Sequence, residues 1–208
     1  MTLDRETVVR TALRLLDEVG FENLTLRKIA AELGVQAPAL YWHFKNKQEL
    51  LDEMASTVFV DAIGEFDLLT GNGTWSEWAA GYGKALRQIL LRHRDGARMF
   101  SGTYLTDTAL YAPMEMALRK FTRAGFSLRD AVVGLSTIYC YTVGFTIEEQ
   151  AVYPRPGELN PQYDLTKRAE RIDGARFPLA LAAGEESFSR FDERFEQGLQ
   201  LIIRGLRP

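Results

Sequence analysis

A short amphipathic helix, a glycine and a second, aromatic helix follow one another between residues 25 and 47, and this succession constrains the fold most strongly. Thr25 can cap the first helix, whose apolar side chains recur every three or four residues at Leu26, Ile29, Ala30 and Leu33. Gly34 can adopt the left-handed conformation of a tight turn. Pro38 suits the first turn of a helix, where its missing N–H costs nothing. The succession predicts a helix-turn-helix motif.

Helices are also predicted on both sides of this motif. Apolar residues at helical spacing predict a helix over residues 4–19, with Asp4 as its N-cap and Gly20 after its end. A capping box over residues 46–49 is expected to begin a fourth helix that leaves the small domain. Leu40 and Phe44 should point into a three-helix core. We therefore expect an N-terminal helix-turn-helix domain over residues 1–48.

The short aromatic helix carries more polar and aromatic groups than one buried face can accept. Tyr41, Trp42, His43 and Phe44 are consecutive, so they cannot all face inward. The whole chain has a net charge of −3, but the segment from residue 27 to 47 holds four basic residues and one acidic residue. A locally basic end on an acidic body suits contact with DNA phosphates. The alternative is a small three-helix bundle whose aromatic residues are simply core.

The run Leu40-Tyr-Trp-His-Phe-Lys-Asn-Lys-Gln-Glu-Leu-Leu51 resembles the DNA-binding domain of the TetR family, and within it the tetracycline repressors. The resemblance covers residues 3–55 and returns in the core domain, at His93-Arg-Asp-Gly-Ala-Arg98 and over residues 127–151. It implies that the second helix of the motif enters the major groove of DNA. The residues at the family's DNA-contacting positions are Thr25, Arg27, Gln36, Ala37, Pro38, Tyr41, His43 and Lys47. Ala37 and Ala39 stand where the tetracycline repressors carry polar side chains, so we expect a different operator sequence.

Residues 49–208 are predicted to form a larger helical domain, which makes the chain all-α. Thr74-Trp-Ser-Glu77 is a capping box for a helix to about residue 92, and further helices are expected over residues 107–123 and 127–151. Residues 153–163 indicate a loop, and residues 164–184 remain ambiguous. The last helix carries an apolar seam of coiled-coil spacing, formed by Phe188, Phe191, Phe195, Leu199, Ile202 and Leu206.

The seam can pack on its own core or on a second copy. The family resemblance implies that the last helix and the long helix before the loop form a four-helix dimer interface, and we therefore expect a homodimer. A dimer also suits a short recognition helix, because one such helix reads too few base pairs to be selective.

Aromatic side chains predicted between the two domains suggest a ligand pocket, and the resemblance implies an enclosed effector. Filling of an ordinary helical core is the alternative. The candidate effector-binding residues are Phe59, Phe66, Tyr82, Leu86, Phe100, Thr103, Tyr104, Met116, Tyr139 and Glu148. Phe100 occupies the position of the histidine with which the tetracycline repressors hold magnesium. A lone glutamate cannot replace that site. We therefore expect a flat, largely apolar, aromatic effector with no metal and no cofactor.

Other protein classes receive little support. The two histidines lack the spacing of a metal pair, and Cys140 in an apolar helix indicates an inert core thiol, so we do not expect an enzyme. No apolar run approaches the roughly 18 residues of a membrane span and no signal peptide is apparent, so we expect a cytoplasmic protein without membrane contact. The prediction is a ligand-responsive regulator, a repressor on palindromic operator DNA. The alternative is a helical dimerisation or scaffold protein with no specific DNA site.

Overall fold

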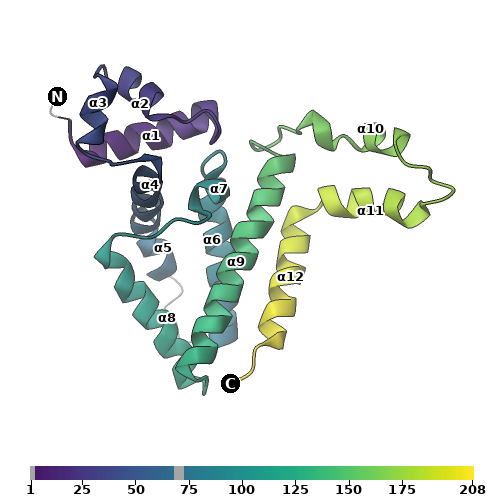
Figure 1. Cartoon of the computed structure of the whole chain (residues 1–208). Helices are drawn as coiled ribbons and strands as arrows, with labels where there is room; N and C mark the ends of the chain where they lie inside the picture. Colours follow the sequence, from purple (N-terminus) through teal and green to yellow (C-terminus); the bar gives the residue numbers. More distant parts are fainter. Residues whose placement is uncertain (1–2, 68–72) are drawn as a thin grey trace.

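The computed structural model describes residues 3–67 and 73–208 and confirms the all-α prediction (Figure 1). Apart from one isolated bridge between Arg155 and Glu158, the regular structure in these ranges is helical. The α-helices are α1 (Arg5–Val19), α2 (Leu26–Glu32), α3 (Ala37–Tyr41), α4 (Lys47–Asp61), α5 (Ile63–Asp67), α6 (Trp75–Leu91), α7 (Gly96–Phe100), α8 (Tyr111–Arg123), α9 (Leu128–Val152), α10 (Leu165–Glu170), α11 (Pro178–Phe188) and α12 (Phe191–Gly205).

Side-chain caps begin the N-terminal helices where the sequence predicts them. The Asp4 side chain accepts a hydrogen bond from the backbone N–H of Thr7 at 2.8 Å, and Thr25 caps α2 in the same way. Asn46 accepts from the backbone N–H of Glu49 at 2.9 Å. The return bond differs from a capping box, because the Glu49 carboxylate accepts from the N–H of Lys45, one residue earlier than predicted. The chain direction before α4 is fixed by both bonds.

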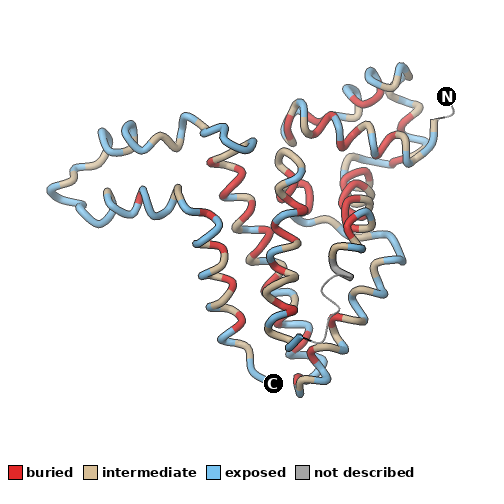
Figure 2. Tube along the Cα trace, turned by 180° about the vertical axis from the view of Figure 1, so that it is seen from behind, coloured by how far each residue is buried: buried red, intermediate tan, exposed pale blue. Residues whose placement is uncertain are grey.

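One hydrophobic core joins the helix-turn-helix to the rest of the protein. Leu40 and Phe44 are fully buried, as predicted, and belong to the same cluster as Phe59 in α4 and Leu86 in α6. Figure 2 shows this buried zone where α1–α4 meet α6 and α7. Because α4 runs through residues 48 and 49, the division of the chain into domains 1–48 and 49–208 stays a prediction.

Helix α9 is the central helix of the C-terminal part. It packs against α6, α7, α8 and α12. By length and composition it is apolar enough to cross a membrane, so the expectation that no segment approaches that limit is wrong. A helix that contacts four neighbours in its own chain is apolar on most sides, because those sides face other apolar groups and not water, as the sides of a membrane-spanning helix do.

The predicted seam is divided and faces inward. Phe188 ends α11, and the chain turns at Arg190, whose φ of 50° is left-handed, before α12 begins at Phe191. Phe195 and Leu199 are buried against Trp78 and Ile138 in one core cluster. The seam is therefore occupied by its own chain and is not a free dimer face.

The faces of α9 and α12 that lie away from this core remain uncovered. Val132, Val133 and Leu201 are exposed there. Cys140 is exposed as well, which corrects the prediction of a core thiol, because it lies on the outer face of α9. Helices α10 and α11 pack on each other and extend away from the body as an arm that is mostly exposed (Figures 1 and 2).

Candidate nucleic-acid interface and ligand cavity

The predicted DNA-contacting residues lie on or beside the helix-turn-helix surface. Five of them are exposed, namely Thr25, Arg27, Gln36, Pro38 and Tyr41, whereas Ala37, His43 and Lys47 are half-buried. Trp42, which follows α3, is 90% exposed, which agrees with the expectation that the aromatic run of residues 41–44 cannot all face inward. Lys28 and Lys45 are exposed too. Their positive charge and their position in or beside the motif are the sequence signals by which Lys28 and Lys45 could have been included among the predicted DNA contacts.

Two cations hold the motif in shape from behind. Arg5 donates to the carbonyl of His43, and its guanidinium lies 4.3 Å from the centre of the Phe44 ring. The Lys47 ammonium donates to the carbonyl of Phe21 at 3.3 Å and lies 4.7 Å from its ring centre. The position of the Lys47 ammonium is therefore restrained by the fold.

A cavity of about 370 Å³ lies between α4, α6, α8 and α9 and the segment before α8. Five predicted effector residues line it, namely Phe59, Tyr82, Tyr104, Met116 and Tyr139. The other lining residues are Ile63, Trp78, Leu105, Asp107, Leu110, Tyr111, Pro113, Met114, Ala117 and Leu135. The structure thus brings half of the predicted set together around one apolar space.

The remaining predicted residues lie elsewhere. Leu86 and Phe100 are fully buried and do not line the cavity; Phe100 supports it from behind, with its ring centre 5.3 Å from that of Phe59. Thr103 donates its hydroxyl to the Phe100 carbonyl at 2.8 Å. Glu148 lines a separate groove between α9 and α12, because it lies on the opposite face of α9 from Tyr139. The Phe66 side chain lies outside the described residues.

Trp78 and the lining residues between positions 105 and 113 are the main lining elements absent from the sequence prediction. The Trp78 ring stacks on Tyr82, with ring centres 5.3 Å apart and planes 6° from parallel. Trp78 is one turn before Tyr82, so the i,i+4 rule could have found it. The segment before α8 has no periodicity, and its place over the cavity is visible only in three dimensions.

The cavity is weakly polar. Burial raises the pKa of the Tyr82 and Tyr139 hydroxyls, which therefore stay neutral. The described lining residues include one carboxylate, Asp107, which accepts a hydrogen bond from the backbone N–H of Ala109 at 2.8 Å, and no lysine, arginine or histidine. Within the described ranges, no three His, Cys, Asp or Glu side chains gather as a metal site. The site suits an uncharged, mostly apolar molecule.

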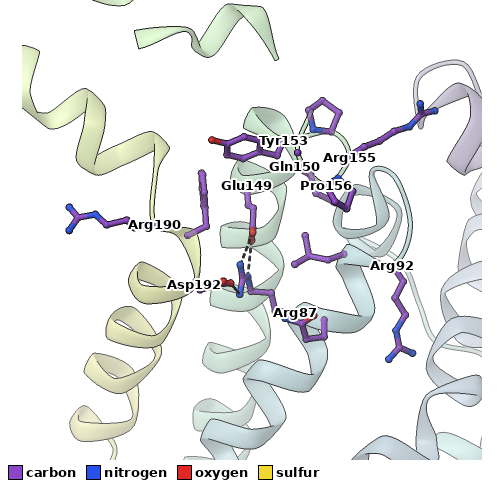
Figure 3. A pocket seen from close by; sticks show the side chains of 14 residues that line it. Arg87, Arg92, Glu149, Gln150, Tyr153, Arg155, Pro156, Arg190 and Asp192 are labelled. Carbon is purple, nitrogen blue, oxygen red and sulfur yellow. Dashed lines mark hydrogen bonds and ion pairs between the residues drawn. The ribbon is translucent and has the colours of Figure 1, made fainter. Parts of the chain in front are cut away.

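A second cavity, of about 570 Å³, lies at the other end of α9 and contains a buried ion pair (Figure 3). The Arg87 guanidinium bonds both oxygens of Glu149 at 2.7 and 2.6 Å, and its third nitrogen lies 2.7 Å from Asp192. Burial alone would lower the pKa of Arg87, but the bonds to Glu149 and Asp192 outweigh it and raise that pKa. This network joins α6, α9 and the start of α12.

Family models match both the N-terminal and the C-terminal part of the chain. Residues 8–54 match the model of the bacterial regulatory proteins of the tetR family, and residues 69–208 match that of the tetracyclin repressor-like C-terminal domain. The class A tetracycline repressor from transposon 1721 of Escherichia coli is 39% identical over 98% of this chain and 90% of its own length.

Solved structures give the same result. A possible TetR family transcriptional regulator from Streptomyces coelicolor is 38% identical over 98% of both chains, with a TM-score of 0.82. A variant TetR from Acinetobacter baumannii in complex with minocycline is 31% identical over 98% of this chain and 96% of its own, with a TM-score of 0.71. Proteins of this family are DNA-binding regulators and not enzymes. The helix-turn-helix, the helical C-terminal domain and these matches together show that the chain belongs to the TetR family of bacterial transcriptional regulators.

Proposed function

We propose that this regulator is a cytoplasmic homodimeric repressor that binds a palindromic operator and releases it when a flat, largely apolar, aromatic effector enters the cavity behind α4. The effector binds without a metal ion, since the described lining residues include one carboxylate and no histidine. The predicted DNA-contacting residues, including Arg27 and Lys47, supply the operator contacts.

Helix α4 carries the proposal, because it connects the two sites. It begins beside the DNA-facing surface at Lys47, runs about 22 Å at 1.5 Å per residue, and places Phe59 in the cavity wall. Phe59 also belongs to the core cluster that contains Leu40 and Phe44 of the motif. A ligand that displaces Phe59 therefore acts on a packed helix whose first turn lies beside the DNA-binding surface. It shifts the balance only by binding the released form more tightly.

The uncovered faces of α9 and α12 support the homodimer. Val133 is 52% exposed and Leu201 71% exposed, and neither belongs to the described core clusters. Pairing through these faces gives a dimer with two recognition helices. Such a dimer reads the two half-sites of a palindrome, whose centres lie roughly 34–36 Å apart.

Operator binding is tested with a palindrome from the neighbouring promoter against random DNA of the same length. A specific repressor binds the palindrome roughly a thousandfold or more tightly. Affinities within about tenfold of each other would reject the specific-repressor reading. Release of the operator by magnesium and micromolar tetracycline would reject the metal-free effector.

The dimer is tested with Val133→Lys, which places a charge on the uncovered face of α9, and with Val133→Ala as the matched control. Sedimentation should show a monomer for the lysine variant and a dimer for the alanine variant. A dimeric lysine variant would place the interface elsewhere.

A further inference from the structure

The indole nitrogen of Trp78 is a buried donor without an acceptor. Trp78 is 4% exposed, and its Nε1 is fully buried with no hydrogen-bond partner in the described part of the chain. One other buried side-chain atom there lacks a partner, Arg94 Nε, but that guanidinium still donates to the Glu18 carbonyl at 3.1 Å. The Trp78 ring has a single polar atom, so its hydrogen-bonding capacity is wholly unused.

An unpaired buried donor is expensive, and native proteins rarely retain one without a role. Trp78 and Met116 line both the aromatic cavity and a neighbouring cavity of about 700 Å³ between α6 and α8, whose lining also includes Arg119, Lys120 and Arg123. A methionine side chain adapts its shape readily, so the part of the wall beside the indole is easily rearranged by an entering molecule. A ligand that presents an acceptor at this wall would satisfy the donor.

We propose that Trp78 determines effector specificity by donating its indole N–H to a neutral carbonyl oxygen of the effector, which is an aromatic ketone, quinone or related compound. The proposal rests on the proposed function and assigns the chemical class of the effector. The stacked pair of Trp78 and Tyr82 supplies a flat wall for the aromatic rings.

A neutral acceptor fits better than an anionic one. The described lining of the aromatic cavity, unlike that of the neighbouring one, holds no lysine, arginine or histidine that would compensate a buried carboxylate or phenolate. Its one ionisable acid, Asp107, would repel such a group. A carbonyl oxygen accepts the hydrogen bond without bringing a charge into the cavity.

The test uses two compounds with the same ring skeleton, fluorenone, which has a carbonyl oxygen, and fluorene, which has none. Calorimetric titration of the full chain should show fluorenone bound at least about tenfold more tightly, because only fluorenone satisfies the donor. Trp78→Phe should remove this preference by weakening fluorenone alone. Trp75→Phe is the control, since Trp75 packs on Phe121 and Phe126 outside the aromatic cavity and should leave the preference unchanged.

A second measurement on the unaltered protein keeps the proposal testable if Trp78→Phe does not fold. Among the three tryptophan indole N–H signals in a nitrogen-15 correlation spectrum, that of Trp78 should move downfield on addition of fluorenone and not of fluorene. Equal affinities for the two compounds, binding of neither, or an unmoved Trp78 signal would overturn the assignment. The proposed function stands apart from this result, because it is tested by specific operator binding and by release of the operator with any compound from a screen of aromatic molecules.

Discussion

Replacing Arg87 by methionine should destabilise the protein far more than a surface ion-pair mutation does. The Arg87 and Glu149 side chains are 6% and 11% exposed, and the pair is bidentate. Arg87→Met leaves the Glu149 carboxylate buried without its cation. Removing one partner of a buried pair costs about 3–5 kcal/mol. For a chain of this size that corresponds to a fall in Tm of roughly 6–20 °C.

The network contains its own control. Asp192 contacts the same guanidinium at 2.7 Å, but its side chain is 88% exposed. Water screens that contact, so Asp192→Asn should cost under about 1 kcal/mol. The double variant Arg87→Met with Glu149→Leu removes both buried charges and should recover most of the stability, because apolar groups of similar size replace a buried pair at little cost.

Thermal and urea unfolding followed by circular dichroism measure these differences. All variants are compared at one protein concentration, since the stability of a dimer depends on it. A cost below about 1 kcal/mol for Arg87→Met, or a cost equal to that of Asp192→Asn, would refute the argument that burial sets the strength of this pair.

Three further predictions use the same reasoning. Lys47→Ala should weaken binding to all DNA sequences about equally and reduce its salt dependence, whereas Arg27→Ala should relax sequence preference. Fluorescence anisotropy titrations on a set of operator variants separate the two effects, and an unchanged sequence preference in Arg27→Ala would show that Arg27 does not read bases. Gly198→Ala should cost about 1–3 kcal/mol, because its Cβ would stand 2.0 Å from the Tyr141 hydroxyl, whereas Gly64→Ala meets nothing within 4 Å and should be nearly neutral in the same unfolding assay. The hydrogen bond from Arg10 lowers the pKa of Asp61 from 3.8, so this pair stabilises the fold above that value and the contribution is lost as the pH falls through the lowered pKa. Asp61→Asn should therefore lose less stability than the unaltered protein between pH 5 and pH 2 in acid titrations; equal losses would contradict the linkage.

Local chemistry explains which parts of the fold can be predicted from the sequence. The capping box of Thr74 and Glu77 forms as expected, and so do the caps of α1 and α2, because each bond joins residues three apart. Gly20 and Gly34 take the positive φ angles that end a helix or turn the chain. The helix-turn-helix follows from such short-range rules, and its buried Leu40 and Phe44 follow from helical periodicity.

Only the tertiary structure decides what covers each apolar face. Periodicity identifies the stripe of Phe195 and Leu199 but not its partner, and the fold packs it on α6 and α9 of the same chain. In the same way, the apolar sequence around Cys140 does not indicate that its thiol is exposed to solvent, since α9 is apolar on nearly all sides. The cavity depends on a further long-range fact. The segment of residues 104–114 closes over α4, α6 and α9, and this places Trp78 in the wall while leaving Phe100 behind it. The sequence by itself thus determines the helices and the DNA-facing motif through contacts within a few residues, and the tertiary structure decides the ligand site and the free faces, because those depend on which distant helices meet.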